Sequence, residues 1–289
     1  LMQPNARSVA LGAVDLHKSY GLVKANRGIS LSVARGEIHA VVGENGAGKS
    51  TLMRMLQGVE RPDHGHVVIA DKQVSLSGPA EALAYSIGMV HQEFMLAPDL
   101  TLLENLVLGE EPVTRNWGPF SRIDWATALR EGQDLAASIG AQIDWHRRTS
   151  SVPVHILQFV EIIRLLRRGC NVLILDEPTA VLAPPQVEEL FGLLRNLRTN
   201  GATILFISHK IGEVMALADQ VTVIRSGKTV FQSALADTTS LEIASHIVSD
   251  APQIAKSTPQ PTHTMGQTVL ELRGLIAPSL EKSQSLKGI

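Results

Sequence analysis

The segment that most constrains this chain is glycine-rich and runs Gly43-Glu44-Asn45-Gly46-Ala47-Gly48-Lys49-Ser50, with Thr51 after it. It fits the pattern G-x-x-x-x-G-K-[ST], a phosphate-holding loop that a strand enters and a helix leaves. The mostly apolar run Glu37–Val42 predicts a short buried strand before the loop. Apolar residues at helical spacing predict a helix from Lys49 to Gln57 after it. The local order is therefore the one that the pattern requires.

The chemistry of this loop predicts that it binds a nucleoside triphosphate. Glycines let backbone N–H groups turn toward the phosphates, and the helix N-terminus adds a partial positive charge. Lys49 adds a full positive charge, and the hydroxyl of Ser50 is a candidate Mg²⁺ ligand. We expect the nucleotide to contact the whole segment, namely Gly43, Glu44, Asn45, Gly46, Ala47, Gly48, Lys49, Ser50 and Thr51.

A second part of the site is predicted far along the chain, where the apolar run Val172–Leu175 ends in Asp176 and Glu177. Such an unbroken run is typical of a central parallel strand buried on both faces. Asp176, at the carboxyl end of that strand, is placed to hold Mg²⁺ directly or through water. Glu177 follows it, where a base would polarise the attacking water. A strand with a solvated turn is the alternative for such a run alone, and the glycine-rich loop argues against it.

Three further residues fit the same arrangement. His209 follows the predicted strand Thr203–Ser208, and ligands of doubly wound sheets gather at strand carboxyl ends, so it is a candidate contact for the γ-phosphate. Gln92 follows the predicted strand Ile87–His91 and is a candidate sensor of Mg²⁺ or of the attacking water. Tyr20 offers an aromatic face for stacking on adenine. Each would be an ordinary surface residue without that context.

In order and spacing these residues resemble the ATPase subunit of ABC transporters over about residues 8–248. The resemblance implies an α/β fold: a P-loop ATPase core with a mainly parallel sheet, an antiparallel β layer and a helical insert subdomain. It implies ATP and Mg²⁺ as cofactors. The roles that it implies are an aromatic loop at Tyr20, catalytic Glu177, His209 and Gln92, and Mg²⁺ ligands Ser50, Gln92 and Asp176.

A finer similarity concerns the stretch Gly88–Pro98, which is followed by Leu100-Thr101 and Glu104-Asn105. This stretch resembles the tandem-domain ATPases of sugar and nucleoside importers. Its Phe-Met-Leu-x-Pro element, residues 94–98, favours the nucleoside branch, which works with basic-membrane-lipoprotein binding proteins. Residues 176–182 have the same character.

One element departs from the family pattern. Where Leu-Ser-Val-Gly would stand in the signature, this chain has Val152-Pro153-Val154-His155. The serine hydroxyl and the glycine N–H that normally contact a γ-phosphate across the dimer are therefore missing, and a proline has no N–H to donate. The D-loop has Ala183 where an aspartate is usual. We expect a defective signature; a local misalignment with Ser150 and Ser151 is the alternative.

The composition bounds the remaining possibilities. A net charge of −2 argues against a nucleic-acid-binding surface, although it does not exclude a local patch. The single cysteine, Cys170, fits a reducing cytoplasm and is predicted to be a small buried apolar residue. No apolar stretch approaches the about 18 residues that span a bilayer, and no signal peptide is recognisable, so we expect a peripheral membrane role. Two arginine groups, residues 147–148 and 164–168, are predicted to lie on solvated faces rather than to meet phosphates.

The chain divides into predicted pieces by pattern. Residues 9–34 alternate as strands and, with residues 67–69, predict the antiparallel layer. Residues 37–92 and 170–230 alternate between strands and helices, which is typical of an α/β sheet. Residues 93–168 are mostly helical in pattern, with helices expected at Ile123–Gly140 and His155–Arg168. In the family such a helical subdomain docks on the transmembrane subunit. We therefore assign residues 1–249 to one ABC-type ATPase domain.

The C-terminal residues follow a different pattern. Residues 250–268 contain three prolines among Ser, Thr and Gln, which predicts a linker. A strand pattern resumes at Val269–Leu275 and mirrors the N-terminal strands, a faint internal repeat. We expect residues 269–289 to be the start of a second, truncated ATPase domain. The first residue is Leu1 rather than Met, which fits a fragment or an unusual start codon.

Together these features predict an ATP-hydrolysing subunit at the cytoplasmic face of a cell membrane. Its partners would be transmembrane permease subunits, a second ATPase domain or subunit and, indirectly, a substrate-binding lipoprotein, with no nucleic acid. The alternative from another class is a non-catalytic nucleotide-binding regulatory module, which the altered signature favours and the intact Lys49, Asp176, Glu177 and His209 oppose. A soluble ABC protein acting on DNA or ribosomes is a third possibility, which the near-neutral charge disfavours.

Overall fold

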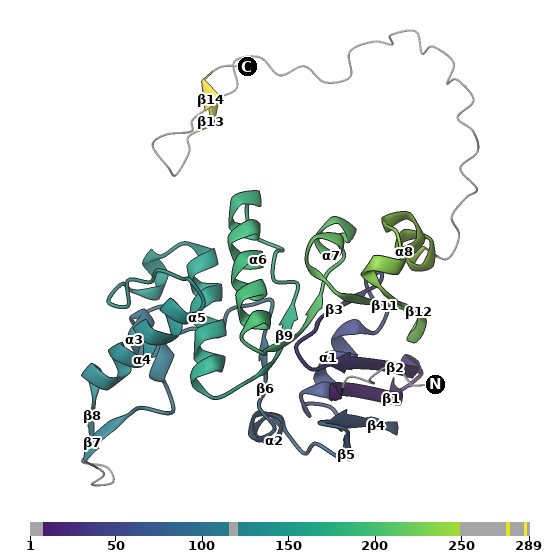
Figure 1. The fold of residues 1–289 in the computed structure, drawn as a ribbon, viewed down its shortest axis with the longest axis horizontal. Coiled ribbons are helices and arrows are strands. Elements are labelled where there is room, and N and C mark those ends of the chain that lie inside the picture. Colours follow the sequence, from purple (N-terminus) through teal and green to yellow (C-terminus); the bar gives the residue numbers. More distant parts are fainter. Residues whose placement is uncertain (1–7, 116–120, 249–275, 278–285, 288–289) are drawn as a thin grey trace, which may run out of the picture. The chain divides into compact units, whose positions relative to one another are not determined.

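The structure is a computed structural model that describes residues 8–115, 121–248, 276–277 and 286–287. It divides into two units, residues 1–249 and 250–289, which are described separately. The first unit contains two large sheets, the helices that cover them and a two-stranded hairpin (Figure 1).

A six-stranded central sheet has the strand order β12-β11-β3-β10-β9-β6. All neighbouring pairs are parallel except β11 with β12. Every residue of β3 and β10 is buried, because helices or a second sheet cover both faces. This confirms the predicted mainly parallel α/β sheet. The strands are β3 Ile38–Val42, β6 Ile87–Val90, β9 Val172–Asp176, β10 Thr203–Ile207, β11 Gln220–Arg225 and β12 Lys228–Ala234.

A second, antiparallel sheet has the order β2-β1-β4-β5 and forms the predicted β layer. Its pairing is not regular: the register between β1 and β2 shifts between Ala13 and Leu16. Asp15 has a positive φ of 50° at this shift, so the alternation changes phase. Val14 is consequently 42% exposed, although Leu16, two residues later, is buried. The strands are β1 Val9–Tyr20, β2 Val23–Ala34, β4 His64–Ile69 and β5 Lys72–Val74.

Two hydrophobic clusters lie on opposite faces of the central sheet, because successive strand residues point to opposite sides. Leu173 and Leu175 belong to the cluster under the helices, whereas Val172 and Ile174 face the antiparallel sheet and α1. The helices outside the insert are α1 Lys49–Leu56, α2 Pro79–Ala84, α6 Pro184–Thr199, α7 Ile211–Leu217 and α8 Ser240–Ile247, with a 3₁₀ turn η3 at Leu235–Asp237.

Between β6 and β9 the chain is mainly helical, and Figure 1 shows α3, α4 and α5 grouped beside α6. The helix expected at Ile123–Gly140 begins later, because Asp124 caps it by accepting a hydrogen bond from the N–H of Thr127. A short hairpin of β7 and β8, which the pattern did not indicate, precedes α4. The elements are α3 Leu102–Val107, β7 Val113–Arg115, β8 Arg122–Ile123, α4 Trp125–Ser138, η2 Thr149–Ser151 and α5 Val154–Arg167.

The second unit is described at only four residues, where β13 (Ile276–Ala277) pairs antiparallel with β14 (Leu286–Lys287). The predicted linker, residues 250–268, and the predicted strand Val269–Leu275 lie outside the described residues. Of the helices in the described part of the chain, none combines the length and apolar character needed to cross a bilayer.

Candidate functional site: a phosphate loop at the strand ends

The glycine-rich loop connects β3 to α1, as predicted, and close approach requires glycine at two of its positions. A Cβ on Gly43 would lie 2.1 Å from the carbonyl oxygen of Ile224, and one on Gly48 would lie 2.5 Å from that of Ala25. Gly48 also has a φ of 103° and precedes α1 without a side-chain cap. The first N–H groups of α1 therefore have no intrahelical partner and point at the loop.

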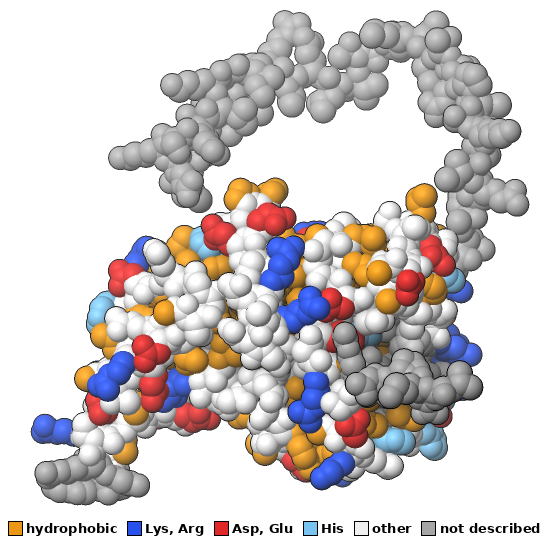
Figure 2. Space-filling model, viewed as in Figure 1, with side chains coloured by type: hydrophobic (Ala, Val, Ile, Leu, Met, Phe, Trp, Pro, Cys, Tyr) orange, Lys and Arg blue, Asp and Glu red, His pale blue; other side chains and the backbone are white. Residues whose placement is uncertain are grey.

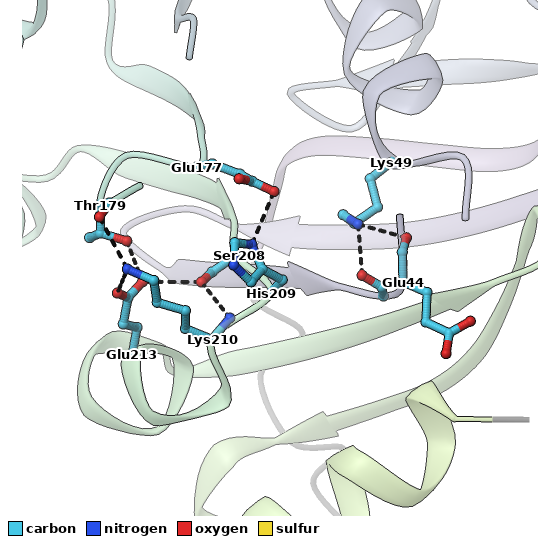
Figure 3. Close-up of polar contacts among 9 residues, drawn as sticks. Glu44, Lys49, Glu177, Thr179, Ser208, His209, Lys210 and Glu213 are labelled. Atoms are coloured by element: carbon cyan, nitrogen blue, oxygen red, sulfur yellow. Dashed lines mark hydrogen bonds and ion pairs between the residues drawn. The ribbon is translucent and has the colours of Figure 1, made fainter. Parts of the chain in front are cut away.

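Lys49 is held inside this loop. It is 6% exposed, and its Nζ donates to the carbonyl oxygens of Gly43 at 2.7 Å and Glu44 at 2.9 Å (Figure 3). Burial lowers the pKa of Lys49, while the nearby carboxylates of Glu177 and Asp176 act in the opposite direction. The ammonium is thus placed in advance at the point where the loop and the two acidic residues meet.

Asn26 of β2 supports the loop from behind, and the sequence did not indicate it. Its Nδ2 donates to the carbonyl oxygen of Gly48 at 3.1 Å, and the residue is 1% exposed. Within the described residues its Oδ1 is buried without a hydrogen-bond partner. A lone asparagine in a strand pattern carries no signal of this role, because its partner lies 22 residues away.

The order β3-β10-β9-β6 brings the other predicted residues to one edge of the central sheet. Asp176 ends β9, Glu177 follows it, and His209 follows β10 by one residue, Ser208. Nδ1 of His209 lies 3.2 Å from Oε1 of Glu177, and the two side chains are 53% and 19% exposed (Figure 3). Glu177 has a φ of 47°, a conformation that non-glycine residues rarely adopt, and its N–H donates to the carbonyl oxygen of Ile207.

The charges at this edge favour a cation beside Asp176. Burial raises the pKa of the Asp176 carboxyl, and repulsion by the Glu177 carboxylate raises it further. His91 and Lys49 act in the opposite direction. His91 directly follows β6 and is a neighbour that the sequence analysis did not single out. Within the described residues, no three His, Cys, Asp or Glu side chains gather as metal ligands. This edge therefore offers only a partial set of metal ligands.

The remaining predicted residues lie around this centre. Ser50 in the first turn of α1 and Gln92 after β6 are exposed, while Thr51 is partly buried. Tyr20 ends β1 at the hairpin to β2, is 41% exposed and has Nζ of Lys18 5.9 Å from its ring centroid. Because β2 contacts the loop through Asn26, the hairpin that carries Tyr20 leads into an element beside the loop.

The altered signature residues lie at the start of α5. Pro153 is the N-cap and makes no side-chain cap hydrogen bond, and Val154 is 38% exposed. Nδ1 of His155 lies 3.0 Å from Nε2 of Gln186, whose Oε1 accepts from the N–H of Ala183. The signature segment and the D-loop region are thus connected by one side-chain contact.

The arginines that were predicted to lie on solvated faces contact the chain itself. Arg164 pairs with Glu161, and Arg167 pairs with Glu131. The side chains of Arg164 and Arg167 are only 17% and 12% exposed, so the prediction is wrong for these two. Arg167 reaches Glu131 on α4, and Arg164 also reaches the carbonyl oxygen of Met95, contacts that a pattern along one helix does not reveal.

Comparison with known proteins agrees with this geometry. The ABC transporter family matches residues 26–180, more than half of the chain. The nucleoside import ATP-binding protein NupA of Lactococcus lactis subsp. cremoris is 37% identical over 98% of this chain and 55% of its own length. The ribose import ATP-binding protein RbsA 3 of Rubrobacter xylanophilus is 39% identical over 89% of this chain and 51% of its own length. The guanosine import ATP-binding protein NupO of Bacillus subtilis is 39% identical over 91% of this chain and 50% of its own length. The chain thus spans about half the length of these relatives.

Solved structures show the same fold. A nucleotide-free ATP-binding cassette from an ABC transporter matches with a TM-score of 0.70 and 25% identity, over 82% of this chain and 98% of that one. The ADP conformation of MJ1267, another such cassette, matches with a TM-score of 0.69 and 26% identity, over 82% of this chain and 93% of that one. By fold and by the family match over residues 26–180, this chain is a member of the ABC transporter family.

Proposed function

We propose that this chain binds and hydrolyses ATP to energise the import of a nucleoside or a sugar through separate membrane subunits. The observation that carries the proposal is the convergence at one sheet edge. Lys49, Asp176, Glu177 and His209 come from three neighbouring strand ends, and the uncapped N-terminus of α1 opens onto the same place.

Each residue has a role that follows from its position. The Lys49 ammonium would exchange its two loop carbonyls for β- and γ-phosphate oxygens, without moving far from where it is already held. Glu177 would accept a proton from the attacking water as general base. His209, in contact with Glu177, would hold the γ-phosphate, and Gln92 would couple the nucleotide state to the membrane subunit. Tyr20 would stack on adenine.

The oxygen ligands present fit Mg²⁺. Asp176 is a carboxyl group in a negative environment, and Ser50 and Gln92 are exposed on neighbouring elements. Such an incomplete protein set suits Mg²⁺, which usually takes one or two protein ligands and completes its shell with phosphates and water. When bound, the ion would neutralise charge on the β- and γ-phosphates.

The substrate and partners are proposed from the relatives. NupA, NupO and RbsA are named for import of nucleosides, guanosine and ribose, and the Phe94–Pro98 element favours the nucleoside branch. The partners would be permease subunits, a second ATPase domain or subunit and, indirectly, a binding lipoprotein, at the cytoplasmic face of the membrane. Figure 2 shows Lys and Arg side chains interspersed with Asp and Glu on the face in view, which supports the absence of a nucleic-acid partner.

The domain assignment is part of the same proposal. Residues 1–249 would be the ATPase domain, with residues 93–168 as the helical subdomain that contacts the permease. Residues 250–268 would be the linker, and residues 269–289 the start of a second ATPase domain. This chain covers about half the length of each relative, which supports this assignment.

The test is Glu177→Gln, measured with the chain assembled with its membrane subunits. The amide has the same size but is a far weaker base, so ATP should still bind while phosphate release falls by at least about 100-fold. Glu188→Gln is the matched control, because Glu188 is an exposed residue of α6. Wild-type turnover in Glu177→Gln would show that another group activates the water. A regulatory, non-hydrolysing role would instead appear as ATP binding without turnover in the wild-type complex, with a second ATPase domain present.

A further inference from the structure

A carboxylate behind the site, that of Glu213 in the first turn of α7, joins the two loops that carry Glu177 and His209. Its Oε2 accepts hydrogen bonds from the hydroxyls of Thr179 and, at 3.1 Å, of Ser208. Its Oε1 lies 3.0 Å from Nζ of Lys210. Figure 3 shows the four side chains together on the side of Glu177 and His209 away from Lys49.

The two hydroxyls come from different strands. Thr179 lies two residues after Glu177 in the loop that leaves β9, and Ser208 directly precedes His209 after β10. Both are 3% exposed, so water does not substitute easily for their partner. Nζ of Lys210 also donates to the carbonyl oxygen of Thr179 at 3.1 Å, which adds a second connection between the loops.

The surrounding donors require an acceptor at both oxygens of Glu213. The Ser208 hydroxyl already accepts from the N–H of Lys210 at 3.0 Å, and it gives its own proton to Glu213. One carboxylate oxygen thus receives two O–H groups while the other faces an ammonium. An amide at this position would turn its NH₂ group toward either the ammonium or the two hydroxyls, and neither arrangement keeps all three contacts.

We propose that Glu213 is a positioning residue for ATP hydrolysis, which sets the distance between Glu177 and His209 by fixing Thr179 and Ser208 to one carboxylate. This inference rests on the proposed hydrolytic role of Glu177. The contact between His209 and Glu177, at 3.2 Å, involves side chains that are themselves partly exposed. The buried hydroxyls of Thr179 and Ser208, held by Glu213, therefore supply the fixed reference. Loss of the cluster leaves both functional residues present but free to separate.

The primary test is Glu213→Gln in the assembled, ATP-hydrolysing complex. A misplacement of reacting groups by about 1 Å costs on the order of 100-fold in rate, so we expect kcat to fall about 10- to 100-fold. The KM for ATP should change by less than about threefold, because the phosphate loop is untouched. The matched control is Glu242→Gln: Glu242 accepts a hydroxyl hydrogen bond from Thr238 at 2.9 Å in the first turn of α8, outside the proposed catalytic residues.

Conservative rescue and a double variant separate positioning from general stability. Thr179→Ser keeps the hydroxyl and should retain most of the rate, whereas Thr179→Val should lose it as Glu213→Gln does. In a His209→Ala background, Glu213→Gln should cause little further loss of rate, because the two residues act as one unit.

Hydrogen exchange on the chain itself gives a readout that does not depend on turnover. The amides of Glu177 and Lys210 should exchange faster in Glu213→Gln than in wild type.

The outcomes distinguish the two proposals. Loss of turnover in Glu177→Gln with wild-type kcat in Glu213→Gln overturns the positioning role alone. Full additivity of Glu213→Gln with His209→Ala also overturns it, as does an equal loss of kcat in Glu242→Gln. Unchanged turnover in Glu177→Gln overturns the hydrolytic role on which the inference depends.

Discussion

Lys49 shows how a single residue can be prepared for a ligand by its surroundings. Its ammonium is buried, which lowers its pKa, and is held by the carbonyl oxygens of Gly43 and Glu44. A buried charge costs free energy in the folded state, so the residue does not stabilise the fold by its charge. Its value lies in binding, where phosphate oxygens would replace the two carbonyls.

Lys49→Ala should therefore weaken ATP binding by about 100-fold or more, since it removes charge-assisted contacts to the phosphates. The thermal unfolding midpoint should stay the same or rise, because a desolvated charge is removed. Titration with a fluorescent ATP analogue and a melting curve check both expectations. Lys72→Ala on exposed β5 is the control. Wild-type affinity in Lys49→Ala would contradict the role of the loop.

Cys170 gives a second prediction at this scale. Burial raises the pKa of its thiol to about 11, and the residue is 3% exposed. Because only the thiolate reacts, modification by a thiol-disulfide reagent at pH 8 should be at least about 100-fold slower in the native protein than in the unfolded chain. Absorbance of the released thiolate measures both rates. Equal rates would show that the start of β9 opens readily.

The residues that the sequence could predict are those whose neighbours along the chain define them. Lys49 is recognisable from the glycines around it, and Asp176 and Glu177 from the apolar run before them. Asn26 and Glu213 could not be found in this way, because their partners lie 22 and 34 residues away. Their roles arise only when β2 reaches the loop and when β9 and β10 pair.

Among the elements, strands and helices were predictable where burial is continuous or periodic. The five residues of β10 are all buried, and their apolar run was sufficient to predict them. The exposure of Val14 was not predictable, because a register shift changes the phase of β1 and no local signal marks that shift. The β7–β8 hairpin was missed for a related reason: the strands are only three and two residues long, which is too short to show alternation.

Helix α5 also holds the segment that follows Gln92. The N–H of Met95 donates to Oε1 of Glu161 at 2.6 Å, and Arg164 donates to the carbonyl oxygen of Met95 at 3.3 Å. Burial raises the pKa of Glu161, and the contacts with Met95 and Arg164 only partly oppose this. An acid whose pKa is raised on folding contributes most to stability while protonated, and that contribution is lost as the pH rises through its folded pKa.

Glu161→Gln should remove this pH dependence, since the amide stays neutral and can still accept from Met95. Relative to the variant, the wild-type free energy of unfolding should fall as the pH rises from about 4 to 7. Denaturant titrations at several pH values measure the difference. Asp124→Asn is the control of opposite sign, because the backbone hydrogen bond from Thr127 lowers the pKa of Asp124. Relative to that variant, the wild-type free energy of unfolding should rise as the pH rises through the unfolded-state pKa of the carboxyl, about 4. A pH-independent difference for Glu161→Gln would contradict the burial argument.

At the scale of the whole molecule, the predicted defect in the signature would limit what the chain can do by itself. The family resemblance implies that one domain's Walker residues close on the signature of another. In this chain that face would present Pro153, which has no N–H, and His155, whose Nδ1 is already in contact with Gln186. A partner with an intact signature would complete the site on Lys49 and Glu177. The defect would then affect only the opposite site.

Two copies of this chain alone would present Pro153, with neither a hydroxyl nor an N–H donor, and the His155 side chain to each γ-phosphate. Because loss of one such donor typically costs about 10²–10³ in rate, we expect the 289-residue chain to bind ATP but to hydrolyse it very slowly. Steady-state phosphate release, measured for the chain alone and after fusion to a complete second ATPase domain, tests this. In the double variant Pro153→Ser/His155→Gly, the serine restores a hydroxyl and an N–H, and the glycine removes the imidazole. This variant should raise the rate of the chain alone, while Glu177→Gln should abolish that gain. Brisk turnover by the unmodified chain, abolished by Glu177→Gln, would mean that residues 152–155 do not limit hydrolysis.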